Sequence, residues 1–334
     1  MLSRVAESIY WMCRYIERAE NIARVVNVNW HLSLDDTSSE PQWQPLIAIT
    51  ADEEPFLERY GDASQANVFR FLALDKLYAN SIYSCMKQAR ENARSVREII
   101  PSDLWEQVNM FYRKVDDATR DPSIELKPHD FLEMVIKESN EFIGRTLTTM
   151  THDDGWFFCR IGRMLERADK TSRILDVKYF YLLPHVEDVG SPLDNVQWSA
   201  LLRSVSALQA YRQRYGQIEP KHVVEHLLLS HDFPRSVRYC VESVQYSVAK
   251  ISGSPDGVYS NDAERNVDQL RSQLACAQAD EVIDEGLHEF VDSLQTKLNY
   301  IGAAIGETFF SGNTVTTKAP GATGMSRMTQ RQDA

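Results

Sequence analysis

Two short runs of acidic and basic residues carry the side chains best suited to chemistry in this chain. Each run places Glu-Arg-Ala-acid on a helical pattern, first with Glu17 and Arg18 and then, 149 positions later, with Glu166 and Arg167. A helical wheel puts Arg14 on the same polar face as Glu17 and Arg18, opposite an apolar face. Guanidinium groups bind carboxylates or phosphates, and a carboxylate can serve as a general base.

Each run forms a charged stripe along its helix. One interpretation is that both stripes are solvated helix faces. Glu20 precedes Arg24 by four residues, and Glu166 precedes Lys170 by four. Such pairs stabilise a helix by only about 0.2–0.5 kcal/mol each, and they require no ligand.

The other interpretation is a ligand-binding or interhelix polar site. Arg14 and Arg18 are like charges four residues apart, and so are Arg163 and Arg167. This spacing is unfavourable by itself, but two adjacent guanidinium groups suit a carboxylate or phosphate held between them. If the two helices face each other, both stripes converge on one cleft. These four arginines are therefore candidate ligand-binding residues.

A third basic stripe contains Arg90, Arg94 and Arg97. Its counterparts in the second half, at positions 245, 249 and 252, are uncharged. A cluster present in one half only indicates something specific to that half, and Arg94 joins the candidate ligand-binding residues.

The two Glu-Arg runs belong to a longer internal repeat. Residues 42–89 align without a gap on residues 197–244, with eleven identities that include Trp43/Trp198 and Cys85/Cys240. A period of about 155 residues is far longer than that of a solenoid. The repeat predicts two tandem units, residues 1–150 and 154–310, packed as one pseudo-two-fold helical bundle.

Apolar residues recur with the helical period along nearly the whole chain, and no segment alternates as a strand does, so the fold class is all-α. Ser102 is expected to cap the helix that follows Pro101. Residues 311–334 lack apolar periodicity and are expected to form a disordered tail. The expected helices span 3–32, 42–50, 55–60, 64–74, 80–100, 102–114, 128–150, 153–184, 194–215, 221–230, 234–251, 261–278 and 280–310.

Composition argues against several classes of protein. The 36 basic and 48 acidic residues give a net charge of −12, which does not favour nucleic acid or an anionic membrane as a partner. Five scattered cysteines without a C-x-x-C pair favour a reducing compartment. The N-terminus is amphipathic, and no window approaches 18 uncharged apolar residues. We expect a soluble cytoplasmic protein.

The stretch His222-Val-Val-Glu225-His226 has the H-x-x-E-H spacing of an inverted zinc-peptidase motif. The first repeat has no histidine at the equivalent positions, so the scaffold does not require a metal there. We predict neither a metal site nor a cofactor.

Motifs in the same order along the chain carry a family resemblance. They lie at residues 2–11, 14–21, 89–97, 105–106, 155–156, 162–169, 233–237, 263–265 and 286–288. Together they resemble the alpha-E family, a bacterial all-helical family named for its Glu-Arg motif, over residues 1–310. The resemblance marks Glu17, Arg18, Glu166 and Arg167 as motif residues, with Arg94 in a neighbouring motif.

The resemblance also implies partners. Alpha-E proteins are typically encoded beside, or fused to, a circularly permuted ATP-grasp enzyme and a transglutaminase-like cysteine peptidase. The favoured expectation is an accessory or binding component of a system that makes or modifies a peptide or amide, with an Arg/Glu cleft for an anionic ligand. One alternative is an enzyme with Glu17 or Glu166 as general base, which needs a raised pKa. The other is a purely structural bundle.

Overall fold

The computed structural model describes residues 1–35, 43–50, 52–181, 192–255 and 257–311. These residues are helical and contain no strand, so the predicted all-α class is confirmed. The predicted tail lies, from residue 312 on, outside the described residues.

In the first half the helices are α1 Ser3–Asp35, α2 Gln44–Ala48, α3 Glu53–Tyr60, α4 Gln65–Phe69, the π-helical η1 Arg70–Leu74, α5 Ile82–Ser95, α6 Ser102–Ala118, the short 3-10 helix η2 Ile124–Leu126 and α7 Pro128–Thr149. In the second half they are α8 Asp154–Tyr181, α9 Pro192–Ser204, α10 Leu208–Tyr215, α11 Pro220–Val224, the π-helical η4 Glu225–Leu229, α12 Val237–Ser252, α13 Asp262–Cys276, α14 Ala279–Ile305 and the π-helical η5 Gly306–Phe310.

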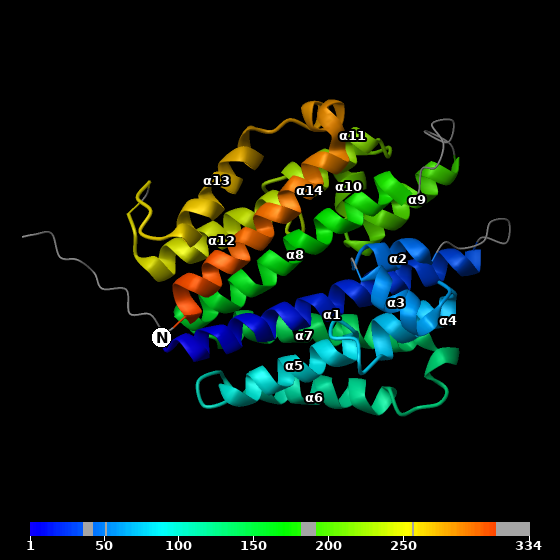
Figure 1. Cartoon of the computed structure of the whole chain (residues 1–334), viewed down its shortest axis with the longest axis horizontal. Helices are drawn as coiled ribbons and strands as arrows, with labels where there is room; N and C mark the ends of the chain where they lie inside the picture. The colour runs from blue at the N-terminus through cyan, green and yellow to red at the C-terminus, as the bar shows by residue number, and fades with distance from the viewer. Residues whose placement is uncertain (36–42, 51, 182–191, 256, 312–334) are drawn as a thin grey trace, which may run out of the picture.

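The long helices α1 and α8 lie side by side at the centre of the molecule and run in the same direction (Figure 1). The N-terminal ammonium group of Met1 lies 3.3 Å from Asp154 Oδ2, so the two helices begin together. Helices α5 and α7 pack on α1, with α6 outside them, whereas α12 and α14 pack on α8, with α13 outside them. The interface between α1 and α8 therefore lies between two groups of helices.

Positions that are 155 residues apart share local structure. Gly61 and Gly216 both end a helix with φ +77°, a conformation that favours glycine. The π-helical segments η1 and η4 follow at the same spacing. Ser81 and Ser236 then cap α5 and α12 by accepting a hydrogen bond from a backbone N–H in the first turn.

Three predicted helix features are wrong. The helix expected over 80–100 ends as α5 at Ser95, and a turn follows over residues 96–99. Ser102 does not cap α6 but is its first residue, and no side chain caps that end. The helix expected over 194–215 is divided into α9 and α10, with Ser206 between them at φ +54°.

The buried core runs through both halves. Trp43 and Trp198 are buried in it, as the repeat predicts for packing residues, and so are the free cysteines Cys85 and Cys240. Of the helices in the described part of the chain, none has the length and apolar content needed to cross a membrane.

Candidate functional site

Small residues let α1 and α8 approach closely. A Cβ atom added to Gly162 would lie 2.3 Å from the backbone carbonyl oxygen of Tyr10, so only glycine fits there without moving a helix. Ala19 and Ala168 are also buried, one on each helix. Because α1 and α8 lie this close, the charged stripes on the two helices are brought into contact.

The Glu-Arg dipeptides of α1 and α8 bind each other reciprocally. Arg18 donates two hydrogen bonds to Glu166, at 2.6 Å from Nε and 3.0 Å from Nη2. Arg167 donates two to Glu17 from the same atoms, at 2.7 Å and 2.8 Å. Glu17 is 1% exposed and Glu166 is 0% exposed. These carboxylates are buried in charge-assisted pairs, so the stripes are not solvated helix faces.

Each carboxylate also has a second cationic neighbour. Arg14 donates from Nε to Glu166 Oε2 at 2.9 Å, with its Nη2 at 2.8 Å from the same oxygen. Arg235, from the turn before α12, reaches Glu17 at 3.4 Å. Each buried negative charge is therefore opposed by two guanidinium groups.

This arrangement determines how the two carboxyl groups titrate. Burial alone would raise the pKa of Glu17, but Arg167 and Arg235 outweigh it and lower that pKa to about 2. Burial would likewise raise the pKa of Glu166, whereas Arg18, Arg14 and Lys170 hold it well below its usual range. A general base working near pH 7 needs a raised pKa, and both shifts run in the opposite direction.

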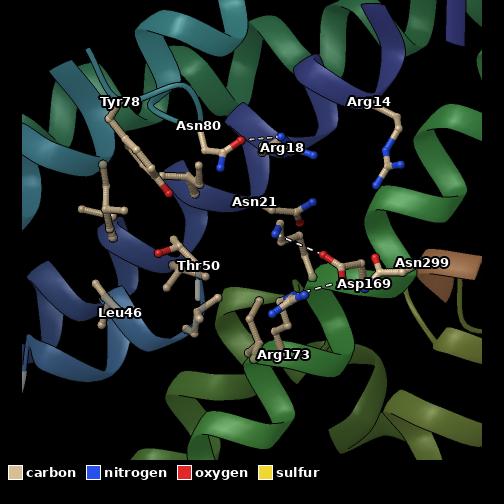
Figure 2. A pocket seen from close by; sticks show the side chains of 17 residues that line it. Arg14, Arg18, Asn21, Leu46, Thr50, Tyr78, Asn80, Asp169, Arg173 and Asn299 are labelled. Atoms are coloured by element: carbon tan, nitrogen blue, oxygen red, sulfur yellow. Dashed lines mark hydrogen bonds and ion pairs between the residues drawn. The ribbon is translucent and has the colours of Figure 1, made fainter. Parts of the chain in front are cut away.

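A pocket of about 180 Å³ opens beside one of the two pairs. Figure 2 shows Arg14 and Arg18 of α1 on one side of it and Asp169 and Arg173 of α8 on another. Aliphatic side chains of α1, α2, η1 and α8 form another part of the wall. The uncharged polar or aromatic lining residues are Asn21, Thr50, Tyr78, Asn80 and Asn299. On this side, the pocket lies beside the contact between the two stripes.

Positive charge exceeds negative charge around this pocket. Arg14, Arg18, Lys170 and Arg173 line it, and their side chains are only 13–20% exposed. The carboxylates that oppose them are Glu166, behind the wall, and Asp169, which lies 3.1 Å from Lys170 and 3.0 Å from Arg173. Four cationic side chains thus face two carboxylates at a partly buried site. An uncompensated positive charge is unfavourable there.

The opposite side of the α1–α8 contact is filled by the chain itself. Arg235 lies there between α1 and α12, donating to Glu20 at 2.5 Å and to Asn21 at 3.0 Å. The position 155 residues earlier is Asn80, a shorter side chain that accepts from Arg18 Nη1 at 2.5 Å. The larger side chain occupies space on one side, and the shorter one lines the pocket on the other.

The remaining predicted ligand-binding residues lie elsewhere. Arg167 is buried against Glu17 and does not line the pocket. Arg163 is buried on the far side, where its Nε and Nη1 atoms have no hydrogen-bond partner. Arg94 is on the outer surface of α5, 62% exposed and paired with Glu91. The structure thus brings Arg14 and Arg18 to the pocket and leaves the other three outside it.

Sequence reasoning did not select Lys170, Arg173 or Asn80 as site residues. Lys170 and Arg173 lie on the same stripe as Glu166, one and two turns further along α8, and this spacing was a usable signal. For Asn80, the only sequence feature that could have indicated a site residue was that the aligned position in the second repeat holds a different residue, Arg235.

In the H-x-x-E-H stretch, the second histidine packs among aromatic rings. His226 is buried against the ring of Phe233, 4.4 Å between centroids, and neither of its ring nitrogens has a hydrogen-bond partner. Burial, assisted by Arg214, lowers its pKa to about 4. Throughout the residues described, His, Cys, Asp and Glu side chains do not gather in threes as a metal would need.

Residues 1–310 match the Alpha-E family, described as a predicted alpha-helical domain with a conserved ER motif. The chain belongs to the Alpha-E family. Two of the Glu-Arg dipeptides in this Alpha-E chain, 17–18 and 166–167, are the ones that meet between α1 and α8.

Similar Alpha-E sequences occur in mycobacteria. An uncharacterised protein of Mycobacterium bovis and one of Mycobacterium tuberculosis (strain CDC 1551 / Oshkosh) are each 24% identical over 303 residues, covering 84% of this chain and 33% of the relative. An uncharacterised protein of M. tuberculosis strain H37Rv is 23% identical over the same length. The chain thus spans about a third of the length of these curated relatives. No solved structure matches it.

Proposed function

We propose that this chain is a binding component whose pocket between α1, α2 and α8 receives a small anionic ligand. The observation that carries the proposal is the charge around the cavity, where Arg14, Arg18, Lys170 and Arg173 face Glu166 and Asp169. A bound anion would neutralise the excess positive charge, and burial strengthens such an interaction.

The paired carboxylates have a positioning role in this proposal. Glu166 holds the guanidinium groups of Arg14 and Arg18 from behind, while both remain part of the pocket lining. Because the side chains are fixed before the ligand arrives, less conformational entropy is lost on binding. The lowered pKa values of Glu17 and Glu166 favour this role over that of a general base.

The two halves are, in this proposal, copies of one ancestral unit around a pseudo-two-fold axis between α1 and α8. Its support is the reciprocal Glu-Arg pairing and the shared local structure at positions 155 residues apart. The two halves then carry related sites on the two sides of the α1–α8 contact. The short Asn80 leaves one of them open, and Arg235 at the aligned position fills the other.

The ligand belongs, in this proposal, to a cytoplasmic system that makes or modifies a peptide or amide with a circularly permuted ATP-grasp ligase and a transglutaminase-like protein. The family resemblance supports these partners, and the curated relatives extend well beyond the matched domain. Co-purification of the full chain with the ligase encoded beside it tests this part. Recovery of the chain alone, at protein concentrations of tens of micromolar, would contradict it.

The pocket itself is tested with succinate and inorganic phosphate as probes. We expect both anions to raise the melting temperature of the full chain above that in sodium chloride of equal ionic strength. Arg173→Gln should weaken binding about tenfold, since a hydrogen bond to a charged group contributes about 1.5–3 kcal/mol.

Arg24→Gln is the matched control. Arg24 pairs with Glu20 four residues before it on α1, as Arg173 pairs with Asp169 on α8, but it does not line the pocket. Each acid keeps another cation after the change, Arg235 for Glu20 and Lys170 for Asp169. Equal loss of binding in both variants, or no stabilisation by either anion, would contradict the proposed site.

A further inference from the structure

The pocket has two chemically different walls. One carries the cationic groups of Arg14, Arg18, Lys170 and Arg173. The other is aliphatic and includes Ile22 of α1. An inorganic anion would contact only the first wall and leave the second against water, which is unfavourable for apolar surface.

The aliphatic wall is assembled from four separate elements. Leu46 of α2, Leu72 of η1 and Ile174 of α8 join Ile22 there. The first half of the chain supplies three of these four residues, and the second half supplies Ile174. A hydrocarbon group of the ligand has a place to be buried among them.

Three of the polar side chains that line the pocket are already engaged, and the exposed Asn299 of α14 lines it as well. Tyr78 donates to Asp52 at 2.5 Å, and the amide nitrogen of Asn80 donates to the same carboxylate at 3.2 Å. Thr50 donates to the backbone carbonyl of Ile47 at 2.7 Å. A sugar or a nucleobase would need several such partners, so recognition rests on charge at one end and apolar contact at the other.

Size and donor number restrict the ligand further. The pocket of about 180 Å³ is smaller than the roughly 300–1,000 Å³ typical of drug-sized ligands. Arg18 already uses Nε and Nη2 on Glu166 and Nη1 on Asn80, which leaves few N–H groups. A carboxylate with two oxygens needs fewer donors than a phosphate with three.

We propose that the pocket takes a carboxylate carried on a short branched aliphatic group, either a free acid or the C-terminal leucine, isoleucine or valine of a peptide. This inference rests on the proposed function and names the ligand class of the same site.

Titration calorimetry of the full chain tests it with 4-methylpentanoate, acetate and 4-methylpentanamide. The first has four more carbons than acetate, and burial of about 0.8 kcal/mol for each methylene predicts binding on the order of 100-fold tighter. The uncharged amide should not bind measurably. N-acetyl-alanyl-leucine separates the two sources: binding at least as tight as that of the free acid indicates a peptide, and binding by the free acid alone indicates a metabolite.

Ile22→Thr tests the aliphatic wall, and it introduces the residue type found 149 positions later at Thr171. It should reduce the advantage of 4-methylpentanoate over acetate at least fivefold. Ile136→Thr is the matched control, because Ile136 on α7 is 9% exposed, against 8% for Ile22, and lies outside the pocket lining.

The outcomes separate this inference from the proposed function. If acetate and phosphate bind but the aliphatic tail adds less than about threefold, the inference is overturned and the anion site stands. If phosphate binds more tightly than 4-methylpentanoate, the carboxylate class is overturned, again without loss of the anion site. If no anion binds, or the amide binds as tightly as the acid, both proposals fail.

Discussion

Replacing Glu166 by glutamine removes one negative charge from between α1 and α8. Glu166 is fully buried and accepts hydrogen bonds from Arg14 and Arg18, so both guanidinium groups would face a neutral amide. Removing one partner of a buried ion pair destabilises a protein by about 3–5 kcal/mol. Because Arg14 and Arg18 are 15% and 16% exposed and regain some hydration, we expect a loss of about 3 kcal/mol.

Glu125→Gln provides the comparison. Arg70 donates to Glu125 through two hydrogen bonds of 2.6 Å, with the same pairing geometry, but these side chains are 47% and 36% exposed. An exposed pair contributes at most about 1 kcal/mol. The Arg18–Glu166 and Arg70–Glu125 pairs therefore share one two-bond geometry and differ in burial, while Glu166 also has Arg14 as a second partner.

The assay is equilibrium unfolding in guanidinium chloride, with the midpoint compared at an unchanged m-value. We expect Glu166→Gln to lose about 2 kcal/mol more of the free energy of unfolding than Glu125→Gln. Equal losses, within about 0.5 kcal/mol, would refute the assignment of Glu166 to a buried, structure-determining pair.

Three further measurements follow from the same structure. Gly162→Ala should destabilise the fold by about 1–3 kcal/mol, because the new Cβ meets the carbonyl oxygen of Tyr10, while Gly144→Ala, with no atom within 4 Å, should be neutral or stabilising in thermal unfolding. Ionised Glu17, with its pKa lowered from 4.5 to about 2, contributes stability that is fully present above pH 4.5 and lost as the pH falls toward 2; the free energy of unfolding of Glu17→Gln should therefore fall less steeply across that window. His226, with its pKa lowered from 6.5 to about 4, takes up a proton more readily when unfolded, so stability is lost as the pH falls from 6.5 toward 4; His226→Phe should lose less between pH 7 and pH 5, on the order of 1 kcal/mol, and an identical loss would contradict a buried neutral histidine.

Much of the helical layout follows from the sequence because local patterns decide it. The apolar period and the capping residues locate most helices to within a few residues. The Glu-Arg stripes were recognisable because like charges at Arg14 and Arg18 make little sense on an isolated helix. The breaks at Ser95 and Ser206 were missed, since tertiary packing and not local propensity determines them.

The site was predicted only in part. Sequence periodicity put Arg14 and Arg18 on one face, and the structure places both in the pocket. The aliphatic wall joins segments far apart in the chain, and no local pattern specifies which of them meet. The role of Arg235 on the opposite side also depends on a long-range contact, with Glu20, that spacing does not reveal.

The most direct test fills the open pocket beside Glu166 in the way that the chain itself fills the opposite side of the α1–α8 contact. The double variant Asn80→Arg with Lys170→Asn gives both positions the residue types of their counterparts in the repeat, Arg235 and Asn21, and it leaves the net charge unchanged. Calorimetry of the full chain with 4-methylpentanoate and succinate is the measurement. We expect this variant, still folded, to bind neither anion, and we expect Arg24→Gln to bind both as the wild type does. Undiminished binding by the double variant would contradict the claim that the pocket beside Glu166 is the anion site.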